Sequence, residues 1–384
     1  MLSSKLCFRG FIFSICFWFF LNGATNTQAQ TRAYVANPIP SRSVTVIDAD
    51  TNTLVTKIPV CSDLSCSPTI PAVTPNGARV YVTNNLQDTV TVIDTLTNTV
   101  IDTITVGPSP WGIAITPDGR RAYVASRTAG IVVIDTSTNT VITTIPDSAM
   151  PLGVAITPDG SRAYVSNALA SVSVVDISTN TIVTNIPIID TTTPFPFPAR
   201  NLFAIALSPD GTRAYVVSES SGNTYVIATS INFMFDTVRT NETTSGSALS
   251  IAISPNSPRA YVATLAFSPL ILIIDTNTNT IIKTINAPGM PPFVGVTPDG
   301  TRLYVNAREG DGPGEASVTI VDASTFAIIS KIVTSDPEWG IAFGTLPPVP
   351  KTKDDCKSSG YQRFTVLDFP NQGQCLKYVK EHGN

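Results

Sequence analysis

The chain has 384 residues, a formal net charge of -4, and 43% hydrophobic against 14% charged residues. This composition excludes a strongly basic nucleic-acid-binding protein, and it excludes a charged disordered chain. The 30 prolines and 23 glycines, spread along the whole sequence, are typical of a globular β-protein with many turns.

The first 29 residues are predicted to be a secretory signal peptide. Lys5 and Arg9 precede the apolar run FIFSICFWFFL at 11–21, and a polar stretch of small residues ends at Ala29. An uncleaved anchor is the alternative, but the apolar run is shorter than the roughly 20 residues that a membrane-spanning helix needs. We therefore expect a secreted or periplasmic protein without a transmembrane segment after cleavage.

Cleavage would leave Cys61, Cys66, Cys356 and Cys375 in the mature chain. An even number of cysteines in an oxidising compartment favours disulfides, and pairing each cysteine with its neighbour in sequence is the simplest of the three connectivities. A zinc site made of all four is the alternative, although neither spacing has the short CxxC form of such sites. We expect no metal.

A repeat of about 40 to 50 residues accounts for most of the chain. The pattern RAYVAN at 32–37 recurs with its tyrosine at Tyr34, Tyr81, Tyr123, Tyr164, Tyr215, Tyr261 and Tyr304. An arginine stands two positions before each tyrosine. A second pattern, SVTVIDADTNTLVTKI at 43–58, follows in every unit, with a decayed copy at 223–238.

Each unit contains four short runs rich in Val, Ile, Thr and Tyr, which predict a four-stranded antiparallel sheet. Seven such units predict an all-β fold, a seven-bladed β-propeller around a central channel. The chain starts with a second strand at 32–37 and ends with an unpaired inner strand, EWGIAFG at 338–344. Pairing of these two strands would close the ring and remove a free sheet edge.

The tyrosine-valine strands after a TPDG turn, followed by VIDTxTNT, resemble the YVTN-repeat propellers of bacterial and archaeal surface and periplasmic proteins. The resemblance covers about 31–346 and implies a propeller domain at 30–346. A linker is predicted at 347–355. The segment 356–384 resembles a cysteine-bracketed tail of secreted bacterial proteins, in which Gln372 to His382 would form a helix pinned by a Cys356–Cys375 bridge.

The repeated polar residues have a structural explanation. Proline and glycine in TPDG suit a tight turn, the aspartate of DTxTNT can cap its own turn amides, and the asparagine can adopt a left-handed conformation. A ring of calcium sites on these aspartates is the alternative, but one carboxylate per blade gives too few oxygens for calcium. The repeated arginines are expected to lie beside turn carboxylates, the alternative being an anion-binding ring.

The candidate binding site is the channel mouth on the face with irregular loops, because variable loops on a rigid scaffold commonly carry binding residues. Alignment of the inner strands places one residue of each blade in a ring: Thr69, Trp111, Leu152, Phe203, Leu249, Pro292 and Trp339. Trp111, Phe203 and Trp339 are the predicted ligand-binding aromatics; the alternative is that they plug the channel. Polar contacts are predicted from Arg127, Arg308, Glu309 and Asp311.

The only histidine, His382, lies in the tail, which excludes histidine-based catalysis, metal binding and haem ligation in the propeller. We expect no cofactor and no catalytic residue, and a monomeric, non-enzymatic propeller that binds a protein, a glycan or a cell-surface component. A lactonase-like hydrolase with channel carboxylates is the first alternative. Binding of single-stranded nucleic acid is a weaker one, because the net charge is acidic.

Overall fold

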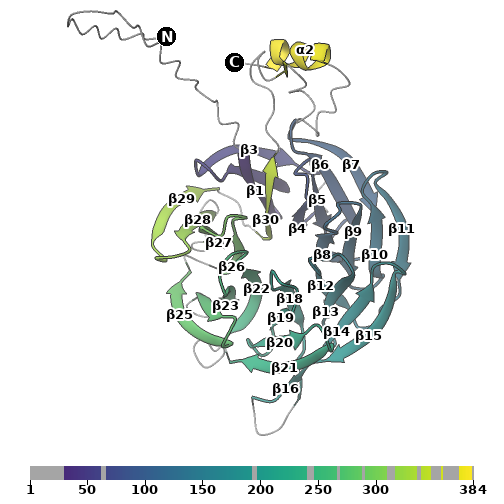
Figure 1. Cartoon of the computed structure of the whole chain (residues 1–384), viewed down its shortest axis with the longest axis vertical. Helices are drawn as coiled ribbons and strands as arrows, with labels where there is room; N and C mark the ends of the chain where they lie inside the picture. The colour runs from purple at the N-terminus through teal and green to yellow at the C-terminus, as the bar shows by residue number, and fades with distance from the viewer. Residues whose placement is uncertain are drawn as a thin grey trace, which may run out of the picture.

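The computed structural model describes residues 30–61, 66–192, 197–239, 246–265, 269–287, 290–308, 316–334, 339–346, 356–357 and 372–382. Within these ranges the chain forms seven four-stranded antiparallel sheets, arranged as blades of a ring (Figure 1). The predicted all-β, seven-bladed propeller is therefore confirmed. The predicted signal peptide and linker lie outside the described residues.

Each blade runs from an inner strand at the channel to an outer strand at the outer edge of the ring. Blades 1 to 3 are β30 (Ile341–Leu346), β1 (Gln30–Asn37), β2 (Ser43–Asp48), β3 (Thr53–Pro59); β4 (Pro68–Val73), β5 (Arg79–Asn84), β6 (Thr89–Asp94), β7 (Thr99–Thr105); and β8 (Pro110–Ile115), β9 (Arg121–Ser126), β10 (Gly130–Asp135), β11 (Thr140–Ile145). Blades 4 and 5 are β12 (Pro151–Ile156), β13 (Arg162–Asn167), β14 (Ser171–Asp176), β15 (Thr181–Pro187); and β18 (Leu202–Leu207), β19 (Arg213–Ser218), β20 (Thr224–Ala228), β21 (Phe233–Val238). Blades 6 and 7 are β22 (Ser247–Ile253), β23 (Arg259–Leu265), β24 (Leu270–Asp275), β25 (Thr280–Asn286); and β26 (Met290–Val296), β27 (Arg302–Arg308), β28 (Ala316–Asp322), β29 (Ile328–Val333).

The ring closes as the sequence predicts, through antiparallel pairing of β30 with β1 from Val35–Ile341 to Gln30–Leu346. The seven inner strands contact one another in the order β30, β4, β8, β12, β18, β22, β26 and back to β30. The closing strand starts at Ile341, later than predicted. Ahead of it, the Trp339 amide donates to the Ala36 carbonyl of β1, and the Gly340 amide donates to the Thr69 carbonyl of blade 2. No sheet edge is therefore left at the junction.

The core is divided among the seven interfaces between neighbouring blades, each of which holds one apolar cluster. The repeated tyrosine of each blade is fully buried in one of these clusters. In five blades its hydroxyl bonds to the turn between the third and fourth strands of the next blade, as in the 2.7 Å bond from Tyr81 to Asn139. The buried hydroxyls of Tyr34 and Tyr261 have no such partner among the described residues. The tyrosine thus joins adjacent blades with apolar contact and, in those five, with a hydrogen bond.

Repeated arginines lie near turn carboxylates, since the charges of Arg121 and Arg302 help to lower the pKa of Asp118 and of Asp299, but the hydrogen bonds of the repeated arginines go elsewhere. Their guanidinium groups donate to the same turn of the next blade, for example from Arg79 to the Thr136 carbonyl at 2.6 Å and from Arg121 to the Ile177 carbonyl at 2.7 Å. A carbonyl at a turn needs a donor when it is covered by a neighbouring blade, and the arginine supplies one. These arginines are therefore contacts between blades.

The turns between the third and fourth strands have the predicted chemistry. The Oδ1 atom of Asp135 accepts from the amides of Ser137 and Thr138 at 2.8 and 3.2 Å, and Asn139 has φ of 54°. Hydrogen bonds to the carboxylate hold the pKa of Asp135, Asp176 and Asp322 below the ordinary range. These carboxylates therefore accept hydrogen bonds from the amides of their own turns. No group of three or more side chains that could bind a metal ion occurs in the described ranges.

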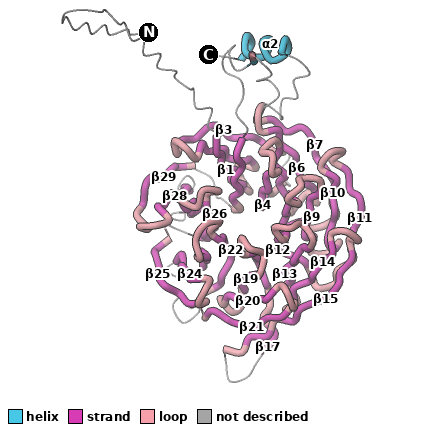
Figure 2. The backbone as a smooth tube through the Cα atoms, viewed as in Figure 1, coloured by secondary structure: helices cyan, strands magenta, loops and turns pink. Residues whose placement is uncertain are grey.

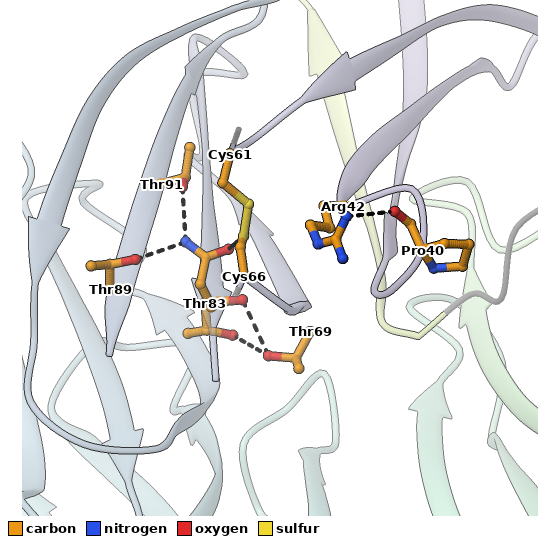
Figure 3. The surroundings of a disulfide bond; sticks show 9 residues. Pro40, Arg42, Cys61, Cys66, Thr69, Thr83, Thr89 and Thr91 are labelled. Carbon is orange, nitrogen blue, oxygen red and sulfur yellow. Dashed lines mark hydrogen bonds between the residues drawn. A yellow bond between two sulfur atoms is a disulfide. The ribbon is translucent and has the colours of Figure 1, made fainter. Parts of the chain in front are cut away.

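Both disulfides join cysteines that are close in sequence, as the simplest connectivity predicts. Cys61–Cys66 bridges the connection from β3 of blade 1 to β4 of blade 2, shown in Figure 3, and Cys356–Cys375 pins the C-terminal helix α2 (Gln372–His382). Cys375 packs with Cys356, Val379 and Leu376 in a small separate cluster. Figure 2 shows α2 outside the ring of strands. None of the helical residues described here forms a segment long and apolar enough to cross a membrane.

Candidate functional site

The two faces of the ring differ. We call the side with the short turns after the first and third strands the turn face, and the side with the remaining connections the loop face. The connections on the loop face vary, and one of them contains an additional hairpin of β16 (Ile189–Asp190) and β17 (Phe197–Pro198). The inner strands start on this face, so their first residues surround the channel mouth.

Small residues bring the inner strands close together at the mouth. A Cβ atom on Gly112 would lie 2.6 Å from the Leu152 carbonyl oxygen, and one on Gly153 would lie 2.9 Å from the Phe203 carbonyl oxygen. A Cβ on Gly340 would lie 2.9 Å from the Thr69 carbonyl oxygen. Any larger side chain at these positions would push the strands apart, so the glycines set the width of the channel.

Four aromatic side chains gather at the mouth; we call them the aromatic rim. The ring centroids of Trp111 and Phe203 are 5.4 Å apart, those of Trp111 and Trp339 are 5.4 Å apart, and those of Trp339 and Phe293 are 5.7 Å apart. These distances are typical of aromatic pairs, which contribute about 0.5–1.5 kcal/mol each beyond their burial. The structure thus brings together the three predicted aromatics, Trp111, Phe203 and Trp339.

A cavity of about 160 Å³ lies against the rim. Its wall is formed by the inner strands, with Ile113, Val154, Ile205, Ile251 and Ile341 among the aliphatic residues. No aspartate, glutamate, arginine, lysine or histidine is among the described residues that line it. The described side chains around this concave site are therefore uncharged, and most of them are apolar.

Phe293 belongs to the rim although the sequence alignment did not select it. It follows Pro292, which occupies the aligned ring position, and it takes the next slot, where other inner strands have Gly112, Gly153 and Ala204. Five of the other six inner strands have Gly, Ala or Ser in this slot and the sixth has Ile70, so an aromatic residue there is a signal that the repeat itself contains. Phe293 is 5% exposed and contacts Trp339.

Of the other predicted residues, Leu152 and Leu249 line the cavity, whereas Thr69 and Arg127 do not. Thr69 is buried and its hydroxyl bonds to Thr83 Oγ1 of its own blade at 2.8 Å. Arg127 is exposed, its amide donates to the Ser109 carbonyl, and it does not line the cavity. Arg308 is the last residue of β27, and the structure does not describe its side chain. Glu309 and Asp311 lie outside the described residues. Their predicted polar contacts stay predictions.

A buried carboxylate, which the sequence analysis did not single out, holds the extra hairpin on the loop face. Asp190 is 1% exposed, and its carboxylate accepts from Thr192, from Asn223 Nδ2 at 3.0 Å and from the Tyr225 hydroxyl at 2.8 Å. Burial acts to raise the pKa of Asp190, but the hydrogen bonds outweigh it and the pKa is lowered. A carboxylate with all these donors is structural and has no free face for chemistry.

Comparison with known proteins supports the fold. Hydrazine synthase of Kuenenia stuttgartiensis aligns with a TM-score of 0.64 and 24% identity, over 74% of this chain and 90% of that chain. A functionally unknown protein from Desulfotomaculum acetoxidans DSM 771 aligns with a TM-score of 0.64 and 18% identity, over 82% and 99%. The dihydro-heme d1 dehydrogenase NirN in complex with DHE aligns with a TM-score of 0.57 and 17% identity, over 81% and 74%.

These identities are below 25%, so the likenesses show the propeller fold and no activity. No family model matches the sequence, and no curated protein matches it. The resemblance to YVTN-repeat propellers therefore stays an expectation.

Proposed function

We propose that this chain is a secreted, non-enzymatic binding propeller that recognises a protein, a glycan or a cell-surface component through its loop face. The observation that carries the proposal is the aromatic rim of Trp111, Phe203, Phe293 and Trp339 beside an uncharged cavity. Trp111, Phe203 and Trp339 are partly exposed, and partly exposed aromatic side chains around a concavity are typical of binding hot spots. The seven interlocked blades supply a rigid base for the loops around it.

The disulfides support the proposed location, because such bonds persist in oxidising compartments.

The hypothesis of a lactonase-like hydrolase has less support than the binding hypothesis. Such a reaction needs a carboxylate, a base or a metal beside the substrate. The described lining of the cavity consists of aliphatic and aromatic residues, glycines, an alanine and Ser250.

The proposal is tested by capture of surface extracts and glycan arrays with the chain from Gln30 onward. We expect the double variant Trp111→Ala with Trp339→Ala to weaken the captured interaction at least tenfold, because truncation of hot-spot aromatics commonly costs about 2 kcal/mol or more of binding free energy. Phe233→Ala, an exposed aromatic on outer strand β21, is the matched control and should bind normally.

Two outcomes would contradict the proposal. Unchanged binding by the double variant, at an unchanged melting temperature, would remove the rim from the binding site. Turnover of any member of a lactone panel by the unmodified protein would favour the enzyme instead.

A further inference from the structure

A cleft lies on the turn face, between blades 2 and 3; we call it the turn-face cleft. It has a volume of about 530 Å³, which is within the range of small-molecule sites in proteins. One wall is the turn between β4 and β5, and the other consists of the two turns of blade 3 on this face. Arg79 crosses the interface and donates to the Thr136 carbonyl at 2.6 Å, so this bond holds the two walls together.

The turn-face cleft presents acceptors and donors that are not used within the described chain. Asp118 and Asp135 each accept a turn amide at Oδ1, at 3.0 and 2.8 Å, and no described residue donates to their Oδ2 atoms. The guanidinium of Arg120 and the Nδ2 atom of Asn76 are exposed and have no hydrogen-bond partner among the described residues. A ligand in the cleft therefore meets two carboxylate acceptors and two sets of donors on rigid turns.

The repeat shows that the turn-face cleft differs from the aligned positions at the other blade interfaces. In the five other turns of this type, the slot of Arg120 holds Ala78, Ser161, Thr212, Pro258 and Thr301. The slot of Asn76 holds an aspartate in four of them, and Asn256 in the fifth. At the interface of blades 3 and 4 the aligned charged residues are three carboxylates and one guanidinium, a net charge of -2: Asp118, Asp159, Asp176 and Arg121. The turn-face cleft has two of each, so its net charge is zero.

This mixture of groups selects among classes of ligand. Hydrogen bonds from turn hydroxyls and amides hold the pKa of Asp118 and Asp135 below the ordinary range, so both carboxylates are ionised and repel an anion. Arg79 and Arg120 repel a cation. An apolar ligand would cover the free donors and acceptors without replacing their bonds to water. A hydroxyl both donates and accepts, so neighbouring hydroxyls of one uncharged molecule can bond to a carboxylate and a guanidinium together.

We infer that the turn-face cleft binds an uncharged sugar, whose neighbouring hydroxyls donate to Asp118 and Asp135 and accept from Arg120 and Asn76. The exposed ring of Pro75 offers an apolar surface for the C–H groups of the sugar. The site lies on the face opposite the aromatic rim, and it goes beyond the proposed function without depending on it.

The experiment uses the chain from Gln30 onward and saturation-transfer NMR with the methyl glycosides of glucose, galactose, mannose and N-acetylglucosamine. We expect at least one glycoside to bind, with an affinity that stays constant between about 0.05 and 0.5 M NaCl, because the ligand carries no charge to be screened. Glycine betaine, inorganic phosphate and N-acetylglycine methylamide represent a zwitterion, an anion and a peptide, and each should bind at least tenfold more weakly. Saturation transfer to none of the glycosides, or equal binding of one of these three probes, would overturn the inference.

Two variants place the sugar in the cleft without disturbing the fold, because each installs a residue that an aligned turn already contains. Arg120→Ser, which copies Ser161, should weaken the best glycoside at least tenfold. Asn76→Asp, which copies Asp118, replaces a donor by a carboxylate and should weaken it at least fivefold. Arg127→Ser removes an exposed guanidinium from the loop face and is the matched control, which should bind normally. Normal binding by both cleft variants, at native melting temperatures, would overturn the inference.

The same variants separate this inference from the proposed function. If the glycoside is lost in Trp111→Ala with Trp339→Ala and kept in Arg120→Ser, the sugar binds on the loop face, so the proposed function stands and the turn-face site is wrong. If the glycoside is lost in Arg120→Ser while capture of surface components ignores the rim, the turn-face site stands and the proposed function falls.

Discussion

Phe326 occupies a position that asparagine holds in the other six turns between third and fourth strands. The backbone there has φ of 63°, which asparagine tolerates and phenylalanine adopts at a cost. The buried hydroxyl of Tyr261 has no hydrogen-bond partner among the described residues, whereas that of Tyr81 bonds to Asn139. Tyr34 is also unpaired, although the corresponding turn contains Asn98. In partial compensation, the Phe326 ring lies 4.6 Å from Lys283 Nζ and 5.4 Å from the Arg259 guanidinium carbon.

We predict that Phe326→Asn raises the free energy of unfolding by about 1 kcal/mol, because it relieves the backbone conformation and restores an acceptor for Tyr261. Urea denaturation of the variant measures this directly. Asn139→Phe is the converse change and should lower stability. A less stable Phe326→Asn would mean that the cation contacts of Phe326 outweigh both gains.

At the scale of an element, the hairpin of β16 and β17 is an insertion that one carboxylate attaches to blade 5. Asp190 accepts from Asn223 before β20 and from Tyr225 within it, and both side chains are buried. The hairpin has a ladder of two residue pairs, so it contributes little stability of its own. Its position on the loop face therefore depends on this polar anchor and on the buried Ile188 and Ala199 at its base.

We predict that Asp190→Asn destabilises the hairpin by about 2 kcal/mol, because an amide places a donor where the carboxylate accepts and a charged hydrogen bond is lost. Hydrogen exchange measured by mass spectrometry should accelerate in the described hairpin residues and not in blade 2. Tyr225→Phe removes one donor only and should give a smaller acceleration. Unchanged exchange in Asp190→Asn would show that the anchor is dispensable.

At the scale of the whole molecule, the ring depends on strands from opposite ends of the described propeller. Gly344 of β30 packs against blade 2, where an added Cβ would lie 2.4 Å from Val73 Cγ1. Since β30 completes blade 1 and also contacts β4, a disturbance here opens the ring at its junction.

We predict that Gly344→Val lowers the free energy of unfolding by about 3 kcal/mol, because the junction has no room for a branched side chain. Thr345→Val is the control, since Thr345 is exposed on the same strand. Urea unfolding of both variants is the measurement. Equal midpoints would show that the junction adapts and that closure does not depend on Gly344.

The stability of the ring should also depend on pH, because aspartates in its turns have lowered pKa values. The lowered groups are Asp48, Asp118, Asp135, Asp159, Asp176, Asp190, Asp210, Asp299 and Asp322. For such groups the folded pKa lies below the unfolded value of 3.8. Their contribution is complete above the unfolded pKa and is lost as the pH falls through the folded pKa.

We therefore predict a urea midpoint that is constant between about pH 7 and pH 5 and that falls steadily below about pH 4. Asp118→Asn should reduce the size of this fall, because Asp118 then no longer contributes a proton-linked hydrogen bond. A midpoint that is the same at pH 3 and pH 7 would contradict the assignment of these carboxylates to the turns.

The sequence by itself determined the seven four-stranded blades, the closing strand pair and the turn chemistry, and it favoured the local disulfides. Each of these features follows from local sequence patterns, namely strand-forming runs, proline-glycine turns, self-capping aspartates and the spacing of cysteines. The aligned repeats also placed Trp111, Phe203 and Trp339 on one circle, since equivalent residues of a ring lie at the same height.

Only the tertiary structure decided which side chains meet across blades. It directed the repeated arginines to carbonyls of the next blade, buried Thr69 in its own blade and added Phe293 to the rim. It also showed that Asp190 is an anchor and that the described cavity lining is uncharged. These outcomes depend on distances between residues far apart in the sequence, which packing fixes and a repeat pattern does not encode.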